Sequence, residues 1–450
     1  MAEMILPGIY IEVRDEGLIS AGRISTGNIG IVGTAPEGPG NEPCLISSVS
    51  EAQEKFGRSG GDYTLVRSLE LIYQNGGRTV YAVRVNTTAS QFEFKKTRNG
   101  ADVSALTLQS KRVGALGNAI TVSVATVNAS TKKVTLQAEA IAEEYTIENF
   151  AALHQAIAAK SQLAKVTRVD DSLSDQLPNN TTGGSETFVG GSDGDYGEAL
   201  KTLENKIVNL VVLAGQDTGK AGMLPALTGH LKATSGIQRE RIGVMGLGFD
   251  DKGQDIVPED VPANDRLILV SPGILLTQNK VTQRLSAGYL AAAIAGVISA
   301  LPVHTSPTNK SVVIEGLTTE FNNASLQQLV QKRVLAVEQR NGFRIVKGIT
   351  THDGAWQQIT TRRIVDYAIY GVRSGCDPYI GKLNNARVRG AMKATLDGFL
   401  TRMVDNEALV SYQLEVSATR AQEIAGEAIV TMTLAPTFSI DFVKVTMYLS

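Results

Sequence analysis

The sequence has few of the residues that mark disulfide scaffolds and metal centres. It contains 2 cysteines, Cys44 and Cys376, and 4 histidines among its 450 residues. Neither type forms a CxxC motif or a Cys/His cluster, which argues against a disulfide framework and against a structural zinc site. We therefore expect no metal ligands, and a protein made in a reducing compartment.

Long apolar runs are also scarce. No basic residue precedes Arg14, although a secretory signal needs a basic region ahead of its apolar stretch. The longest apolar run, Tyr289–Val303, is interrupted by Gly296 and Pro302 and is shorter than the roughly 20 residues that span a bilayer. We expect a buried helix at this place, a soluble protein and no membrane insertion.

The chain has no excess of charge of one sign. Its 43 Lys and Arg residues nearly balance 45 Asp and Glu residues, which disfavours general contact with nucleic acid. Locally, however, residues 332–402 carry thirteen basic and five acidic side chains, a difference of +8. This asymmetry indicates either a cationic face that meets an acidic partner or a set of scattered, solvated charges.

Recognisable catalytic motifs are rare. The sequence contains no phosphate-binding loop, but Gly190–Gly194 fits the GxSxG pattern of a nucleophile elbow. Ser192 would need a base, and the histidines that follow it in the chain are His230, His304 and His352. The predicted strand before the motif, Thr187–Val189, is short, and Gly-Ser-Asp-Gly is common turn chemistry. We favour a hinge between two domains and predict no catalytic residue and no cofactor.

The hydrophobic pattern changes along the chain and predicts several domains, about three for this length. After Asn86, the Val- and Thr-rich segments within residues 103–142 are typical of antiparallel sheets. After Gly190, helical patterns alternate with continuous apolar strands. This alternation predicts an α/β layer with a buried, largely parallel sheet.

Both ends of the chain have the pattern of strands. One is Ile9–Val13, and the other is Phe438–Leu449, in which the apolar side chains change face between Phe442 and Val443. A terminal strand that is apolar on both faces needs cover on both, and its exposed edge invites association with another chain. The alternative is that each end pairs within its own domain.

Several segments, taken in their order along the chain, resemble the contractile tail sheath proteins of bacteriophages and related contractile injection particles. The opening LPGIYIE (6–12) is similar to the PGVYVEE start of that family, and NIGIVGTAPEGPGNEP (28–43) and NGGRTVYAVRV (75–85) resemble two of its motifs. Further similar segments are GALGNAITV (114–122), GGSDG (190–194), SPTNK (306–310), GITTHDG (348–354) and TRRI (361–364). Each segment is weak alone, but their common order is specific.

The resemblance implies a multidomain α/β and β architecture. A discontinuous core domain would be assembled from the N- and C-terminal portions, around an inserted β-sandwich and an inserted α/β domain that is called subtilisin-like for its topology and has no protease activity. The segments predicted on this plan are an N-terminal arm (1–20), the N-terminal part of the core or a first domain (21–88), the β-sandwich-like domain (89–190), the subtilisin-like domain (191–320), a C-terminal inner, tube-facing domain (321–432) and a C-terminal arm (433–450).

The resemblance also implies a function. The protein would be the structural subunit of a helical sheath of stacked hexameric rings, assembled in the bacterial host cytoplasm around a tail tube, in a virion tail or another contractile particle. Contraction would drive the tube through a bacterial envelope, and the other partners would be baseplate and tail terminator proteins. The alternatives that remain are an α/β serine hydrolase using Ser192, and a static shell or surface-layer protein.

The site residues that the resemblance implies lie in the two arms and on one predicted helix. The arms would add strands to a sheet of neighbouring subunits, through Ile9, Tyr10, Ile11, Val13, Phe438, Ile440, Phe442, Val443, Val445, Met447 and Leu449. The candidates for contact with the tube are Arg387, Arg389 and Lys393.

Overall fold

The chain divides into two units that we describe separately. The structure is a computed structural model that describes residues 25–181, 183–278 and 280–447. One unit, the sheet unit, comprises residues 27–302 and 307–357. The other, the C-terminal unit, comprises the described residues 25–26, 303–306 and 358–447. The predicted arm residues Ile9, Tyr10, Ile11, Val13 and Leu449 lie outside the described residues.

The sheet unit contains a nine-stranded, largely parallel sheet in the order β16-β19-β18-β13-β12-β11-β1-β3-β2. Its strands are β1 (Ile29–Gly33), β2 (Cys44–Ile46), β3 (Val80–Arg84), β11 (Leu210–Asp217), β12 (Ile242–Gly246), β13 (Leu267–Ser271), β16 (Ser311–Val312), β18 (Leu335–Gln339) and β19 (Phe343–Ile345). The strands from β3 through β1, β11, β12 and β13 to β18 pair in parallel. Every residue of β1, β12 and β13 is buried, which explains their continuous apolar sequence.

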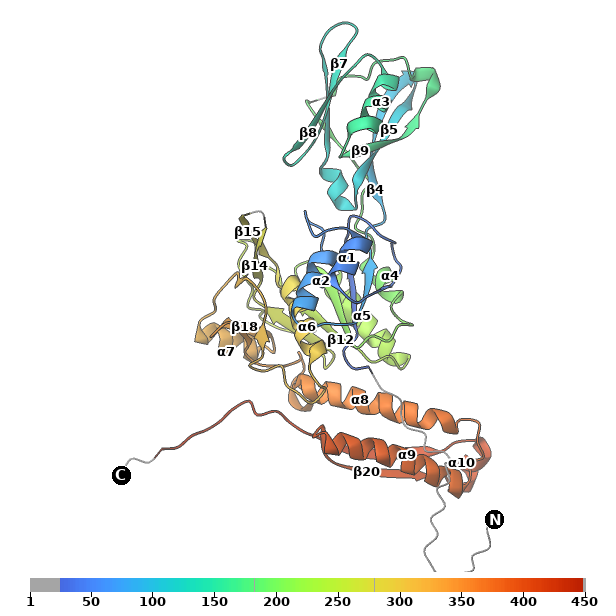
Figure 1. Cartoon of the computed structure of the whole chain (residues 1–450), viewed down its shortest axis with the longest axis vertical. Helices are drawn as coiled ribbons and strands as arrows, with labels where there is room; N and C mark the ends of the chain where they lie inside the picture. Colours follow the sequence, from blue (N-terminus) through green and yellow to red (C-terminus); the bar gives the residue numbers. More distant parts are fainter. Residues whose placement is uncertain (1–24, 182, 279, 448–450) are drawn as a thin grey trace, which may run out of the picture. The chain divides into compact units, whose positions relative to one another are not determined.

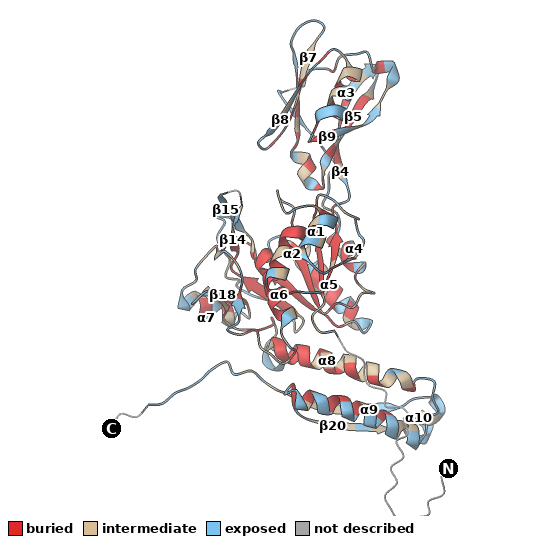
Figure 2. Cartoon of the chain, viewed as in Figure 1, coloured by how far each residue is buried: buried red, intermediate tan, exposed pale blue. Residues whose placement is uncertain are grey.

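Helices cover both faces of this sheet. They are α1 (Val49–Phe56), α2 (Leu65–Gln74), α4 (Tyr196–Lys201), α5 (Met223–Gly236), α6 (Ala287–Ala300) and α7 (Asn323–Gln331). On β12, Gly243 faces leucines of α5 and Gly246 faces the start of α6, and an odd spacing along a strand places two residues on opposite faces. Helix α6 is buried over nearly its whole length (Figure 2), as the sequence predicted. None of the described helices combines the length and the apolar character that a membrane span requires.

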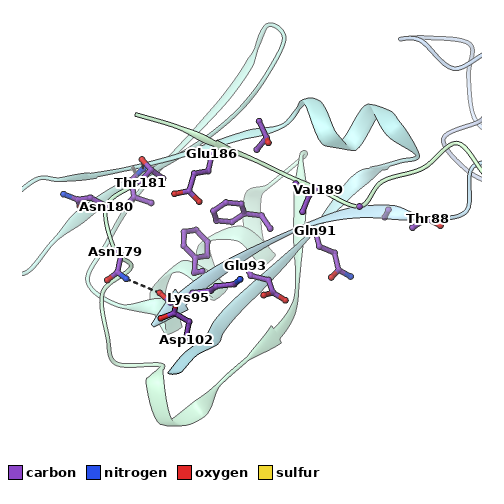
Figure 3. A pocket seen from close by; sticks show the side chains of 16 residues that line it. Thr88, Gln91, Glu93, Lys95, Asp102, Asn179, Asn180, Thr181, Glu186 and Val189 are labelled. Carbon is purple, nitrogen blue, oxygen red and sulfur yellow. Dashed lines mark hydrogen bonds between the residues drawn. The ribbon is translucent and has the colours of Figure 1, made fainter. Parts of the chain in front are cut away.

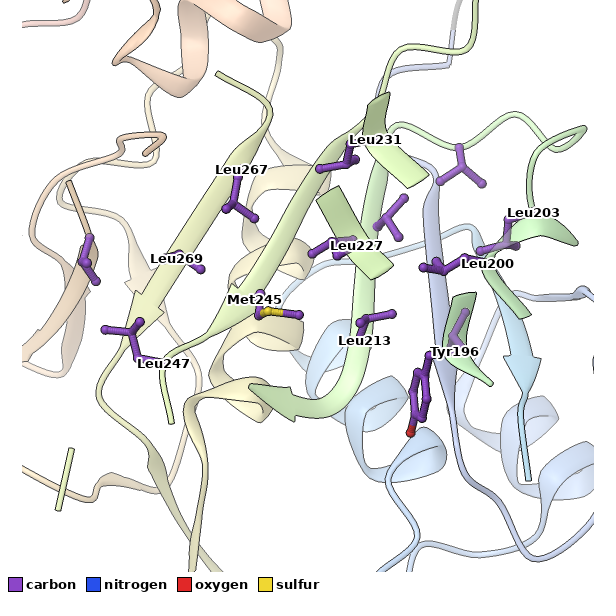
Figure 4. Packing of buried hydrophobic residues seen from close by; sticks show 14 of the residues in the cluster. Tyr196, Leu200, Leu203, Leu213, Leu227, Leu231, Met245, Leu247, Leu267 and Leu269 are labelled. Atoms are coloured by element: carbon purple, nitrogen blue, oxygen red, sulfur yellow. The ribbon is translucent and has the colours of Figure 1, made fainter. Parts of the chain in front are cut away.

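The core on the α5 face joins strands that are far apart in the sequence. Leu213 of β11 and Met245 of β12 pack in one cluster with Leu227 and Leu231 of α5 (Figure 4). Leu329 of α7 belongs to the same cluster. The segments predicted as 21–88, 191–320 and 321–432 therefore contribute strands to one sheet, because parallel neighbours are brought together by crossover connections and not by proximity in sequence.

Residues 89–190 form two antiparallel sheets around a core of their own. The sheets run β4-β5-β9 and β10-β6-β7-β8. Their strands are β4 (Ala89–Arg98), β5 (Ala101–Val113), β6 (Thr121–Thr126), β7 (Lys132–Ala138), β8 (Ile141–Ile147), β9 (Ala164–Val169) and β10 (Glu186–Thr187), with helix α3 (Phe150–Lys160). Phe92, Phe94, Phe150 and Phe188 lie in the shared core. A further small sheet of the sheet unit contains β14 (Ile274–Gln278), β15 (Val281–Leu285) and β17 (Gly316–Leu317).

The C-terminal unit is a helical hairpin with a β-ribbon. Helices α8 (Ile359–Cys376) and α9 (Ala386–Asp405) lie side by side (Figure 1), with the rings of Tyr367 and Phe399 5.6 Å apart. Strands β20 (Leu409–Ser417) and β21 (Ile429–Pro436) form an antiparallel ribbon, and α10 (Arg420–Ala425) connects them. The observed fold confirms a mixed α/β protein with several sheets.

Most helices begin at a side chain that accepts a backbone N–H bond, as isolated helix ends require. These residues are Ser48, Asn149, Asp195, Ser286, Asn322, Asn385 and Thr419, for α1, α3, α4, α6, α7, α9 and α10 respectively. Helices α2, α5 and α8 differ, because Thr64, Gly222 and Gln358 in front of them make no side-chain bond of this kind.

Candidate assembly surface

The segment after β21 exposes a run of apolar side chains. Residues 437–447 belong to no helix or strand, although the sequence predicts a strand here. Six of the predicted arm side chains are 59–84% exposed: Phe438, Ile440, Phe442, Val443, Val445 and Met447. Contiguous exposed apolar surface of this kind marks interaction sites. The described part of this segment is therefore not covered by its own chain as a paired strand would be.

The β20–β21 ribbon has two open edges. Within the described residues, β20 and β21 pair only with each other. Tyr412, Leu414 and Leu434 face the helices and join their apolar cluster, whereas polar residues such as Gln413 and Thr433 are exposed. A two-stranded ribbon is marginally stable without such packing, and its outer edges present main-chain groups that can pair with further strands. Sequence reasoning singled out the end of the chain and missed this ribbon as a possible acceptor.

The three basic candidates on α9 have different surroundings. Arg387 and Lys393 are exposed. Arg389 is only 14% exposed at its side chain, and its Nη1 lies 3.0 Å from Oε1 of Glu423 on α10. Hydrogen bonds from Arg420 and Arg389 hold the pKa of the Glu423 carboxyl below its ordinary value. Arg389 thus ties α9 to α10, a role that the sequence does not reveal because Glu423 is distant along the chain.

The basic residues within 332–402 are divided between the two units. Five of its thirteen basic residues lie in the sheet unit and eight lie in the C-terminal unit. Arg362 and Arg363 at the start of α8 are buried. Arg362 donates to Asp366 at 2.7 Å, one helical turn later, and burial lowers the pKa of Arg363 to about 10. The cationic surface is therefore smaller than the composition indicates.

The GxSxG motif forms a hydrogen-bonded turn. The Ser192 hydroxyl accepts the Gly194 N–H at 3.1 Å, and Asp193 accepts the N–H of Ala115 at 2.9 Å. Gly191 and the side chain of Asn118 exchange two hydrogen bonds of 2.9 Å. Among the hydrogen bonds of the described residues, none joins Ser192 to a histidine. This geometry supports the interpretation of the motif as a turn where the chain leaves residues 89–190.

One pocket lies between β4 and the segment leading to β10 (Figure 3). It has a volume of about 870 Å³, with Phe92 and Phe94 among its lining residues. Asn179 Nδ2 donates to Lys95 O at 3.2 Å, and Thr181 Oγ1 accepts the Val124 N–H at 3.2 Å. The residues shown to line it include no histidine or cysteine. Among the described residues no group of His, Cys, Asp or Glu side chains could hold a metal ion.

Two family models match the chain. The model described as the phage tail sheath C-terminal domain matches residues 351–450, which include α8, α9 and the β20–β21 ribbon. The model described as the N-terminal region of domain III of the tail sheath protein Gp18 matches residues 26–85, which include β1 to β3. These matches confirm the resemblance to contractile tail sheath proteins that the sequence motifs indicated.

Solved structures of sheath proteins share the fold. A sheath tail protein from Desulfitobacterium hafniense is similar with a TM-score of 0.55 and 17% identity, over 96% of this chain and 100% of that chain. The helical sheath of the anti-feeding prophage in its contracted state gives 0.60 and 15%, over 98% and 99%. The contracted PVC sheath complex of an extracellular contractile injection system gives 0.57 and 13%, over 100% and 98%. No curated protein matches the sequence.

The comparisons favour a structural sheath protein over the two alternatives, the α/β hydrolase and the static shell. At these sequence identities, the similarity to the solved structures shows the fold alone. The resemblance to sheath proteins in sequence comes from the two family models.

Proposed function

We propose that the protein is the subunit of a contractile sheath, which polymerises around a tail tube and contracts to drive the tube through a bacterial envelope. The observation that carries this proposal is the uncovered apolar segment 437–447, which lies within the region that matches the sheath C-terminal domain. A segment of this kind is expected to find its cover on another chain.

The terminal arms would join neighbouring subunits by strand addition. Among the described residues, both edges of the β20–β21 ribbon are unpaired. The ribbon can therefore accept one strand on each side, from Ile9–Val13 of one neighbour and from Phe438–Leu449 of another. Main-chain hydrogen bonds would provide affinity, and the alternating side chains would set the register. Each bond contributes about 0.5–1.5 kcal/mol, and repetition through a lattice raises the total strength by effective concentration.

The domain plan carried over from the resemblance is part of this proposal. Residues 89–190, with their own core, would be an inserted β-sandwich, and the strands and helices of 191–320 would form the subtilisin-like part. The C-terminal unit would carry the strands that link neighbouring subunits, and it would face the tube. Energy for contraction would be stored at assembly as the difference between two packings of the same subunits, so no nucleotide or other cofactor is needed.

The remaining partners follow from the same role. Arg387 and Lys393, which are exposed, would meet an acidic tube surface, while Arg389 would act within the chain. A baseplate and a tail terminator would bound the sheath, as one similar chain belongs to the structure of the anti-feeding prophage baseplate. Assembly would take place in the bacterial host cytoplasm, with no contact to nucleic acid.

Electron microscopy of the purified protein with tail tubes tests the proposal. We expect tubular polymers with two alternative lattices, one extended and one shortened. A single lattice under all conditions would support the static shell instead, and a protein that stays monomeric beside tubes would contradict the sheath role. Esterase activity that depends on Ser192 would favour the hydrolase.

A further inference from the structure

The side-chain amide of Gln358 holds the root of the C-terminal segment. Its Oε1 accepts the N–H and the hydroxyl of Ser439, each at 3.2 Å. Its Nε2 donates to the carbonyl oxygen of Ser439 and to Oδ2 of Asp441, each at 3.4 Å. One side chain thus binds both main-chain groups of Ser439, as a neighbouring strand would do in an antiparallel pair.

This contact lies at the point where the segment leaves the β20–β21 ribbon. The ribbon ends with β21 at Pro436, and the Thr437 N–H then donates to the carbonyl oxygen of Ala408 at 3.2 Å. Two residues later, Ser439 is bound by the side-chain amide of Gln358. The apolar side chains that follow, from Phe442 to Met447, are exposed. Gln358 is therefore placed between the folded ribbon and the exposed arm.

The side chain of Gln358 does not cap the helix that it precedes. It directly precedes α8, where a side chain commonly accepts an N–H bond from the first turn, but it makes no such bond. Its contact within α8 is a hydrogen bond of 3.4 Å from the Thr360 hydroxyl. Its acceptor and its donor are directed mainly at the C-terminal segment.

We propose that Gln358 is a positioning residue for strand addition between subunits. It fixes the point and the direction in which the C-terminal arm leaves the subunit. This inference rests on the proposed function and deepens it. An arm that is held at its root samples fewer directions, so its effective concentration at the open ribbon edge of one particular neighbour is higher. The amide both donates to Ser439 and accepts from it, whereas a side chain that caps the start of a helix only accepts.

The variant Gln358→Glu separates these two roles. A carboxylate in front of α8 interacts favourably with the positive end of the helix dipole, so the stability of α8 is maintained or raised. The same carboxylate cannot donate to the Ser439 carbonyl, and it places a negative charge beside Asp441. A merely structural role would leave the arm unaffected in this variant, whereas the positioning role predicts a loosened arm in a subunit of unchanged stability.

Hydrogen exchange of the monomer, with assembly followed by sedimentation, tests the inference. We expect about tenfold faster exchange of the Ser439 amide for Gln358→Ala, because the acceptor of its N–H is lost. Exchange should also be faster for Gln358→Glu, because the carboxylate loses both donor bonds and repels Asp441. Sheath assembly should be slowed at least several-fold. Gln357→Glu, which adds the same charge one residue earlier, should match the wild type. Asp441→Asn in the Gln358→Glu background should restore part of the assembly rate, since the amide can donate to the new carboxylate.

The outcomes separate the inference from the function on which it rests. Unchanged exchange in both Gln358 variants would overturn the contact, whether or not sheaths form. Faster exchange with wild-type assembly would overturn the positioning role. If the wild type forms no sheath around tubes, the proposed function fails, and the exchange data still decide whether Gln358 holds Ser439.

Discussion

Gly371 on α8 faces the ring of Phe399 on α9 so closely that a methyl group at residue 371 would overlap the ring. Phe399 is buried together with Ile364 and Leu400 in the cluster that joins the two helices. The close approach of α8 and α9 at this point therefore depends on the absence of a side chain at residue 371.

We expect Gly371→Ala to lower the free energy of unfolding by about 1–3 kcal/mol, because the added methyl group overpacks the contact between the helices. Urea denaturation followed by circular dichroism measures this. Gly390→Ala on α9 is the matched control, since a methyl group there meets no atom within 4 Å. It should instead stabilise the helix by about 1 kcal/mol. Equal effects of the two substitutions would contradict the packing described for Gly371.

His230 and Arg241 form a buried pair in the sheet unit, with Nε2 of the histidine 2.8 Å from Nη1 of the arginine. Burial, assisted by the Arg241 charge, lowers the pKa of His230 to about 4. The folded-state pKa is thus below the unfolded value of about 6.5, and folding excludes a proton. The contribution to stability is present above pH 6.5 and is lost as the pH falls toward 4.

We expect this group to reduce the free energy of unfolding by about 3 kcal/mol between pH 7 and pH 4. His230→Gln should flatten that part of the pH profile, as measured by denaturant unfolding at several pH values. His154→Gln, at an exposed position on α3, should leave the slope as it is in the wild type. A slope that survives in His230→Gln would show that other groups cause it.

The arm can be tested without removing it. Val443 and Val445 are 79% and 74% exposed, so aspartate at both positions should leave the thermal midpoint of the monomer within about 1 °C of the wild type. Polymerisation should fail, because the charges cannot be buried against a neighbouring subunit. Val127→Asp, at a valine that is 56% exposed in the sheet unit, is the control. Sheaths of normal length from the double variant, or from a chain lacking Phe438–Ser450, would contradict the arm role.

The α9 charges divide into two groups that mutation can separate. Arg387→Glu with Lys393→Glu should leave stability unchanged and weaken co-sedimentation with tail tubes, increasingly so at low salt, where exposed charges interact most strongly. Arg389→Glu should act differently, because it replaces the ion pair between Arg389 and Glu423 with two carboxylates that repel each other. We expect it to destabilise the C-terminal unit in a thermal melt. Tube binding that is unaffected by the first pair would remove α9 from the tube surface.

Ser192→Ala tests the turn against the nucleophile. The substitution removes one hydrogen bond to Gly194, so a loss of about 0.5–1.5 kcal/mol in stability is expected. Asn118→Ala removes the two bonds to Gly191 and should cost more. Neither variant should change hydrolysis of an activated ester relative to the wild type, and a selective loss in Ser192→Ala would revive the hydrolase.

Local sequence determined the elements whose pattern is strong. Helix α6, Ala287–Ala300, covers most of the apolar run Tyr289–Val303, where the sequence predicts a buried helix. Helix α2, Leu65–Gln74, likewise follows the apolar spacing of its own segment. Both depend on apolar spacing and terminal residues within a few turns, which are properties of neighbouring residues in the chain. The motifs in their order were sufficient for the resemblance to sheath proteins.

Tertiary structure alone decided the contacts between distant residues. Nothing local indicates that β1 pairs with β11, that Arg389 serves Glu423, or that Gln358 holds Ser439 across 81 positions. The strand predicted at Phe438–Leu449 also depends on tertiary contacts, because a segment becomes a strand only where an edge is available to pair with it. The sequence specifies the apolar alternation of that segment, but the partner that would make it a strand comes from the assembled fold.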